Sequence, residues 1–372
     1  MQDDELGPDG RALLDGTAWT QFCKLLEQAG AVVLRESAPR DPQTRAEGFR
    51  YLSRMARAGL EAFLEFADPT APVLRRTVDE TKKMGSDNPD NYYLNAAISG
   101  AYEYKITGTR GTVDYLAFAT QKGGYGEGRG LPPTGQIEAS ELELGPNGEL
   151  ELWVSCERKP GNWLAMEPES GLLIVRQTFG DRRREVPAEL TIECIGREGP
   201  PRQPGPDEIG HGLRRAGMLV GGAAALFANW AEGFRKRPNE LPQFDPNVSR
   251  MAGGDPAIAY YHAYWELAPD QALVVEFEPP VCQTWNFQIN NWWMESLDYR
   301  FNPVVINKFG AKVRDDGSVR LILSHRDPGL GNWLSTCGLP QGTMCLRWVR
   351  AETHPQPRTR VVALADLEAE AG

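Results

Sequence analysis

Histidine and cysteine are scarce in this chain, and neither follows the spacing of a metal site. The sequence of 372 residues contains 4 histidines and 6 cysteines. No two cysteines form a Cys-x-x-Cys pair, which excludes a metal ribbon, and such dispersed histidines do not suit a multi-histidine centre. We therefore expect neither a metal nor a cofactor.

A basic excess and long hydrophobic runs are also missing. The net charge of −11 excludes a general nucleic-acid binder, which requires a basic face. The longest weakly apolar run, 216–230, is rich in Gly and Ala and too short to cross a bilayer. Residues 1–10 are acidic and show no signal peptide. Together with the scattered cysteines, these features predict a cytoplasmic protein without nucleic-acid or membrane partners.

The chain does contain an internal repeat. Residues 147–176 and 316–347 share one order of features: turn, strand, Pro-Gly loop, Gly-Asn-Trp-Leu, glycine, second strand and arginine. The offset between the two segments is 169 residues at the opening turn and 171 at the closing arginines, Arg176 and Arg347. So small a drift predicts a duplicated β domain.

Short strands separated by glycine and proline turns fill both copies. Residues 102–108 alternate apolar and polar side chains, and 113–119 follow after a Gly-rich turn, so we expect these two strands to form a hairpin. Residues 272–279 and 285–289 repeat this pattern in the second copy. The predicted fold is mainly β with α: two tandem jelly-roll-like antiparallel β-sandwich domains related by internal duplication, plus N-terminal and inter-domain helices.

Helical periodicity appears before and between the two copies. Apolar spacing predicts helices in 11–29, 45–67 and 207–237, and a further short helix in 73–83. The Pro- and Gly-rich stretch 199–206 is typical of a linker. The expected units are an N-terminal helical segment 1–90, a first sandwich 91–197, a linker with helices 198–257, and a second sandwich 258–372.

The second copy carries motifs of a known family. They are Trp285-Asn286-Phe287, Asp316-Gly317-Ser318, Asp327-Pro328-Gly329, Asn332-Trp333-Leu334, and Gly342 through Arg347-Trp348. In order and spacing, these motifs resemble the bacterial family named domain of unknown function 1214, and the first copy resembles it more loosely. The resemblance implies a jelly-roll β-sandwich beside helices. It implies no catalytic role, because that family has no established activity.

The copies differ where the second copy has its candidate acid/base residues. Where the first copy has Cys-Glu-Arg-Lys at 156–159, the second has His325 and, two residues later, Asp327. Histidine titrates near neutral pH and serves as a general acid or base, with Asp327 placed to orient it. Arg347 offers a planar fork to a carboxylate or phosphate. Two alternatives stay open: Asp327 caps its own turn, and Arg347, like Arg176, ties a strand end to a carboxylate.

A second candidate site is rich in aromatic and amide side chains. Aromatic faces with polar rims suit sugars and aromatic acids. His262 and Glu266 share a face in either a helix or a strand, so they form a second candidate acid/base pair. The same cluster is equally suited to forming the core between the two lobes. The candidate substrate-binding residues are Arg347, Trp285, Asn291, Trp292, Trp293 and Arg300.

The repeated Asn-Trp dipeptides favour a structural role. Asn162-Trp163 and Asn332-Trp333 stand in both copies, and a constraint of the fold acts on both copies, whereas a single site does not. We expect the asparagine to close a loop through backbone hydrogen bonds and the tryptophan to cover one end of the sandwich.

Acid/base groups without a redox motif favour a cofactor-independent cytoplasmic enzyme of hydrolase or lyase type. It would act on a small polar or aromatic metabolite through His325, Asp327, His262 and Glu266. Two alternatives stay open. One is a non-catalytic carbohydrate or small-molecule binding module that uses the aromatic side chains. The other is a structural subunit whose aromatic face forms a homo-oligomer.

Overall fold

The computed structural model describes residues 6–128 and 130–371, which fold mainly into β-strands. The strands of the first half are β1 (Asn91–Ala97), β2 (Tyr104–Thr109), β3 (Tyr115–Lys122), β4 (Pro133–Glu138), β5 (Glu149–Ser155), β6 (Trp163–Ala165), β7 (Ser170–Thr178) and β8 (Glu189–Cys194). Those of the second half are β9 (Ile258–Glu266), β10 (Gln271–Phe277), β11 (Thr284–Asn290), β12 (Val305–Asn307), β13 (Val319–Ser324), β14 (Trp333–Ser335), β15 (Gln341–Val349) and β16 (Arg358–Ala363).

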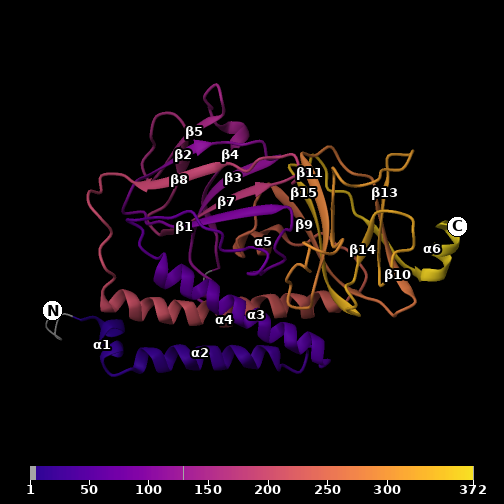
Figure 1. Cartoon of the computed structure of the whole chain (residues 1–372), viewed down its shortest axis with the longest axis horizontal. Helices are drawn as coiled ribbons and strands as arrows, with labels where there is room; N and C mark the ends of the chain where they lie inside the picture. Colours follow the sequence, from indigo (N-terminus) through magenta and orange to yellow (C-terminus); the bar gives the residue numbers. More distant parts are fainter. Residues whose placement is uncertain (1–5, 129, 372) are drawn as a thin grey trace.

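The two halves repeat each other strand for strand. The first half consists of an inner sheet, β1-β7-β3-β4, and an outer sheet, β6-β5-β2-β8. The second half has an inner sheet, β9-β15-β11-β12, and an outer sheet, β14-β13-β10-β16, in the same order. Pairing is antiparallel except that β6 runs parallel to β5 and β14 parallel to β13. The chain is thus a duplicated β-sandwich protein with helices (Figure 1).

The predicted hairpin of 102–108 with 113–119 is wrong. Strand β2 pairs with β5 and β8, whereas β3 pairs with β4 and β7 in the other sheet. The connection crosses the sandwich, so Ile106 and Phe118 belong to the core from opposite sheets instead of lying side by side in one sheet. Alternation of side chains identifies a strand and its buried face, but it does not identify the partner strand.

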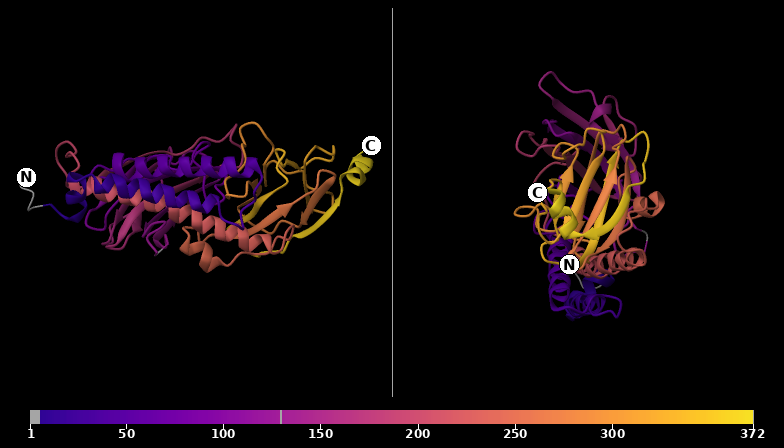
Figure 2. Two further views of the ribbon diagram at one scale, coloured as in Figure 1. Left: turned by 90° about the horizontal axis from the view of Figure 1, so that it is seen from below. Right: turned by 90° about the vertical axis from the view of Figure 1, so that its right-hand side faces the viewer.

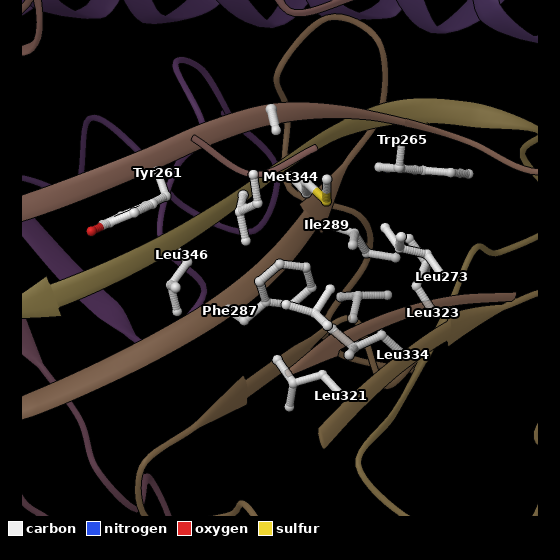
Figure 3. Packing of buried hydrophobic residues seen from close by; sticks show 14 of the residues in the cluster. Tyr261, Trp265, Leu273, Phe287, Ile289, Leu321, Leu323, Leu334, Met344 and Leu346 are labelled. Atoms are coloured by element: carbon white, nitrogen blue, oxygen red, sulfur yellow. The ribbon is translucent and has the colours of Figure 1, made fainter. Parts of the chain in front are cut away.

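Each sandwich has its own apolar core between its two sheets. In the second copy, Phe287 and Ile289 of β11 and Leu346 of β15 face Leu321 and Leu323 of β13, all with at most 1% of their surface exposed (Figure 3). Burial of a side chain of this size contributes about 1.5–3 kcal/mol. Because alternate residues of β9 and β15 fill this core, the residues between them face outward, toward the helices and the first copy.

The helical elements are α1 (Pro8–Leu14), α2 (Thr17–Val33), α3 (Pro42–Leu60), the π-helix η2 (Glu61–Glu65), the 3-10 helix η3 (Ala139–Glu141), α4 (Pro206–Arg235), α5 (Pro246–Met251) and α6 (Leu364–Ala371). Helices α1 to α4 form a layer on one side of the first sandwich, and α3 and α4 extend toward the second, whereas α6 lies at the far end of the second sandwich (Figures 1 and 2). Helices α1 to α4 and η2 confirm the helices predicted in 11–29, 45–67 and 207–237. Within the described ranges, every helix is too short or too polar to cross a bilayer.

The short helix predicted in 73–83 is wrong, because this segment is irregular. The Asp79 side chain accepts hydrogen bonds from the backbone N–H groups of Thr81 and Lys82 at 2.7 and 2.9 Å. Such a local side-chain turn competes with a helix for the same backbone donors. Arg75 then forms an isolated antiparallel bridge with Asn95 of β1.

Two crossing loops link the copies. The first crossing loop, 84–90, has the sequence Met-Gly-Ser-Asp-Asn-Pro-Asp, and the second, 251–257, has Met-Ala-Gly-Gly-Asp-Pro-Ala, at an offset of 167 residues. Each packs against the inner sheet of the other copy. Asn286 of β11 donates to Asn88 in the first loop, and Tyr115 of β3 donates to Asp255 in the second at 3.0 Å. The repeat therefore includes the loops that precede β1 and β9.

Candidate functional site

A cavity of about 460 Å³ lies where the two copies meet the helical layer. Its walls come from β1 and β7 of the first inner sheet, β9 and β15 of the second, both crossing loops, α4 and η2. A volume of this size is typical of sites for small organic ligands, which measure about 300–1,000 Å³. The cavity thus follows from the duplication, because neither copy alone encloses it.

Two tyrosine–arginine pairs form one end of the cavity. Tyr93 of β1 is the register partner of Arg176 on β7, and Tyr260 of β9 is the register partner of Arg347 on β15. The tyrosines stand 167 residues apart and the arginines 171. The two pairs are therefore equivalent positions of the repeat, brought together at the contact between the copies.

Arg347 is buried, and its hydrogen-bond acceptors are all uncharged. Its Nη1 donates to Gln288 Oε1 at 2.5 Å and to Asn286 Oδ1 at 3.4 Å, and its Nη2 donates to the carbonyl of Ser86. Only 4% of Arg347 is exposed. No carboxylate of the described residues lies within 4.0 Å of its guanidinium. The buried Asp87 of the first crossing loop, which also lines the cavity, attracts it from a longer distance and already accepts two hydrogen bonds from Ser296. A buried cation without a close counter-ion favours an anion in the adjoining space.

Arg176 occupies the equivalent position but has a counter-ion. Its Nη2 donates to the carbonyl of Gly253 at 2.6 Å, and its Nη1 lies 3.9 Å from Asp255 Oδ2. The residue equivalent to Asp255 in the first crossing loop is Asn88, an uncharged amide. The duplication therefore places two guanidinium groups in the cavity and supplies an acidic partner to one of them.

The two tyrosines add hydrogen-bond donors to the same end. Each hydroxyl oxygen accepts one backbone N–H, from Asn88 to Tyr93 at 3.2 Å and from Asp255 to Tyr260 at 3.1 Å. Burial raises the pKa of both tyrosines, so both hydroxyls stay protonated at neutral pH. Neither O–H has an acceptor among the described residues, so this end of the cavity is rich in donors.

His262 stands beside this end in a neutral form. Burial, with a smaller contribution from Arg347, lowers the pKa of His262 to about 3. Its ring stacks on Tyr260 and Phe234 at centroid distances of 5.7 and 5.9 Å, and its Nδ1 has no hydrogen-bond partner. A neutral imidazole offers one donor and one acceptor to a ligand, but with so low a pKa it is a weak proton acceptor.

The rest of the wall is largely apolar, and its other two arginines are already paired. Arg75 lies over the ring of Phe66 at 3.8 Å and bonds to Glu61 at 3.2 Å. Arg215 lies over a second phenylalanine ring, at 4.2 Å, and bonds to Glu127 at 2.9 Å. Arg75 and Arg215 therefore need no negative charge from a ligand.

A second, polar pocket of about 360 Å³ lies beside α3 and the turn after β11. Its buried carboxylate, Glu295, accepts from Arg54 at 2.5 Å and from Asn291 at 2.8 Å. Its buried ammonium, Lys83, donates to two oxygens of Ser296 at 2.7 and 3.0 Å. Burial raises the pKa of Glu295 and lowers that of Lys83. Glu295 has Arg54 as its counter-ion, and Lys83 has three uncharged acceptors. The larger cavity is the stronger candidate site because it is larger and its wall has the apolar surface that an organic ligand needs.

The residues predicted to bind substrate separate into two groups. Arg347 lines the cavity between the copies. Trp285 lies in the core of the second sandwich, and Trp292 and Trp293 pack against the helices, where Trp293 Nε1 donates to the carbonyl of Thr44. Most of this aromatic cluster therefore belongs to the packing between lobes, the alternative left open by the sequence.

Two further predicted residues hold local structure. The Asn291 side chain accepts from the backbone N–H groups of Trp293 and Glu295, which closes a turn after β11. Arg300 forms an exposed pair with Asp298 at 2.7 Å. Neither residue lines the cavity between the copies.

The predicted acid/base residues do not gather at one place. His262 lines the cavity, whereas Glu266 is exposed at the end of β9, about 13 Å away at the rise of a strand. His325 bonds to Thr336 and to the carbonyl of Leu267, away from the cavity lining. Asp327 accepts from the backbone of the following Gly-containing turn at 2.8 Å, as a turn cap does. Within the described chain, no three His, Cys, Asp or Glu side chains assemble as a metal site requires.

Tyr93 and Arg176 also belong to the site, although neither is among the site residues predicted from the sequence. The signal that identifies them is the repeat itself: Tyr93 matches Tyr260, and Arg176 matches Arg347, on strands that pair in both copies. The tyrosine–arginine pair occurs in both copies and faces out of both sandwiches. Both pairs therefore lie in a space that the two copies share. That space is the cavity between the copies.

Fold and site together define a class of protein: one chain with two β-sandwich copies that enclose a donor-lined cavity. The chain belongs to the same family as a protein from Burkholderia cenocepacia, described as uncharacterized, whose crystal structure it matches with 47% sequence identity and a TM-score of 0.95. The match covers 96% of this chain and 99% of that one.

A second solved structure is more distant. The VPA0106 protein from Vibrio parahaemolyticus has 11% identity and a TM-score of 0.49, with coverage of 91% and 100%, which is too low to carry an argument. No protein-family model and no curated protein sequence matches the chain. The resemblance of the second copy to domain of unknown function 1214 therefore stays a prediction.

Proposed function

We propose that this protein binds a small organic anion in the cavity between its two copies, with Arg347 as the main anchor. The observation that carries the proposal is the contrast between the two equivalent arginines. Arg176 has the Asp255 carboxylate at 3.9 Å, whereas Arg347 has only uncharged acceptors. A ligand carboxylate would supply the missing counter-charge in a dry site, where a charge-assisted hydrogen bond is strongest.

The donors around Arg347 support an anion over a neutral sugar. Tyr93 and Tyr260 each have an O–H without a protein acceptor, and Arg176 uses only Nη2 in a hydrogen bond among the described residues. A sugar hydroxyl needs acceptors as well as donors. At this end the side-chain acceptors are the unpaired Nδ1 of His262 and the Asp87 carboxylate, which already accepts two hydrogen bonds from Ser296. Excess donors favour a carboxylate, which only accepts.

The test is calorimetric titration with matched pairs of ligands. Benzoate and hexanoate, each with the amide of the same skeleton, separate charge from shape at constant ionic strength. We expect the acids to bind and the amides to bind at least tenfold more weakly. Arg347→Gln should weaken binding of the acids about 100-fold, since loss of a buried charge partner costs about 2–5 kcal/mol. Arg300→Gln, which removes a surface arginine, is the control and should change nothing. Equal binding of acids and amides would contradict the proposal.

A second candidate function is an acid/base enzyme of hydrolase or lyase type, supported by His262 in the same cavity. Its low pKa favours a binding role, because a base with a pKa of about 3 removes protons poorly at neutral pH. The assay is hydrolysis of 4-nitrophenyl hexanoate. Turnover that disappears in His262→Asn while hexanoate still binds would support the enzyme, and absence of turnover in the unmodified protein would support binding alone.

Three finer assignments accompany this proposal. The resemblance to domain of unknown function 1214 supports a jelly-roll description of each sandwich. The scattered cysteines, all free in the structure, support a cytoplasmic location. The exposed Trp19 and Phe49 on α2 and α3 are compatible with a homo-oligomer.

A further inference from the structure

We infer that the ligand is a long, unbranched aliphatic acid, with its carboxylate at Arg347 and its chain along α4. This inference rests on the proposed function and adds the shape of the ligand to its charge. It depends on three features of the cavity: its length, the apolar character of its walls, and the position of its unpaired cation at one end.

The length follows from the elements that line the cavity. Arg215 and Trp230 both line it, and both belong to α4, so at 1.5 Å per residue they lie about 22 Å apart. On β1, Tyr93 and Ala97 also line it, about 13 Å apart at the rise of a strand. In Figure 1, α4 runs below β1 and toward the second copy. The cavity is therefore elongated along this helix.

The charge lies at one end of this length. Trp230 packs against His262 at 5.8 Å, and His262 stacks on Tyr260, the register partner of Arg347. The end near Trp230 is thus the donor-rich end. At the opposite end, Arg215 is paired with its own carboxylate and lies flat on an aromatic ring.

Apolar side chains form the cavity wall between the two ends. Leu219 and Phe227 of α4 lie on one side, and Leu172 and Ile174 of β7 on the other. Val73, from the irregular segment before β1, adds a further apolar contact. A compact aromatic acid would leave most of this wall without a partner, whereas an alkyl chain would cover it and gain free energy with every buried methylene.

The first experiment is a chain-length series on the full-length protein. Calorimetric titration uses straight-chain carboxylates from butanoate to tetradecanoate, at concentrations below micelle formation. We expect the affinity to rise about fourfold per added methylene, the equivalent of about 0.8 kcal/mol, until the chain reaches the far end. Beyond that length the affinity should level off. Dodecanol should bind at least tenfold more weakly than dodecanoate.

The second experiment shortens the cavity. Ala97→Phe adds a ring at the far end of β1, so it should abolish the gain for long chains while the affinity for hexanoate stays unchanged. Unchanged hexanoate binding also shows that the variant is folded. The matched control is Ala101→Phe, the same substitution at an exposed position outside the cavity lining, which should leave the whole series unchanged.

The outcomes separate this inference from the proposed function. If short acids bind through Arg347 but chain length has no effect, the anion site stands and the aliphatic ligand is wrong. If dodecyl phosphate binds more tightly than dodecanoate, the carboxylate head group is wrong. If no acid binds at any length, both the proposed function and this inference fail.

Discussion

Each copy contributes a tyrosine–arginine pair to the same cavity. The two arginines differ in whether a carboxylate lies within 4.0 Å of them. In the first copy, Arg176 lies 3.9 Å from Asp255 of the second crossing loop. In the second copy, Arg347 meets the first crossing loop, where Asn88 stands at the equivalent position and the carboxylates of Asp87 and Asp90 lie more than 4.0 Å from the guanidinium. The fold is repeated, but the balance of charge is not. Duplication thus supplies symmetric donors, and one change from carboxylate to amide leaves an arginine for a ligand.

The largest expected loss of stability comes from replacing Arg176, the arginine that has a carboxylate partner. Arg176→Gln leaves the Asp255 carboxylate, whose side chain is fully buried, without its cation, so unfolding should become about 3–5 kcal/mol easier. Arg347→Gln leaves only neutral acceptors unpaired and should cost about 1–3 kcal/mol. Urea denaturation at pH 7 measures both values.

A double variant sharpens this comparison. In Arg176→Gln with Asp255→Asn, no buried carboxylate remains, so the double variant should recover at least half of the stability that the single variant loses. Equal losses for Arg176→Gln and Arg347→Gln would show that the two arginines are not different in charge balance, and the anion site would lose its main support.

The next effect concerns His262, whose counterpart in the first copy is Asn95. Burial, then Arg347, lowers the pKa of His262 to about 3, so the unfolded chain binds a proton near pH 6.5 that the folded chain does not. Stability from this group is present above pH 6.5 and is lost as the pH falls toward 3. Between pH 6.5 and 4 the unmodified protein should lose about 3 kcal/mol more than His262→Asn does. Parallel pH profiles in urea denaturation would overturn this expectation.

Asp90 lies in the first crossing loop, and its counterpart in the second loop is Ala257. Its effect on the pH dependence of stability should have the opposite sign to that of His262. Burial is the main cause that raises the pKa of Asp90 to about 6, so the folded chain binds the extra proton. Stability should therefore fall as the pH rises from about 4 to about 6, by about 2–3 kcal/mol relative to Asp90→Asn. Asp316→Asn, at an exposed turn, is the matched control. A difference between Asp90→Asn and the unmodified protein that stays constant with pH would contradict the raised pKa.

The smallest effect should come from the repeated asparagines. Asn162 Nδ2 donates to the carbonyls of Glu143 and Glu151, and Asn332 Nδ2 donates to those of Lys312 and Arg320. In alanine variants, loss of these hydrogen bonds alone should cost about 1–2 kcal/mol at either position. Because Asn332 has a φ of 48°, its alanine variant should cost about 1 kcal/mol more. Thermal unfolding of the two variants side by side measures the difference.

The sequence predicted the duplication and the sandwich class but not the strand partners. Matching Gly-Asn-Trp-Leu segments and strand alternation depend on local chain geometry, so they are visible in the sequence. The hairpin prediction for 102–108 failed because the chain crosses between sheets there, a choice made by packing across the core. The 73–83 prediction failed because the side chain of Asp79 competes for helical backbone donors.

The site was harder to predict than the fold, because it forms only where the copies meet. Arg347 and His262 were found as chemically capable residues, and both line the cavity. His325 and Asp327, chosen because they differ between the copies, lie elsewhere. Tyr93 and Arg176 became recognisable only once the register of β1 with β7 and of β9 with β15 was known.

Each crossing loop packs against the other copy, and this has a consequence for biosynthesis. Residues 86–90 of the first loop are covered by β11 and β15, which the ribosome makes much later. At about 5–20 residues per second, roughly 13–50 seconds separate synthesis of Ser86 from that of Arg347. During that interval the nascent first sandwich exposes a polar loop and an unfinished cavity wall. The first crossing loop therefore reaches its native packing only after the second copy has been made, and chaperones have time to act on the half-made protein.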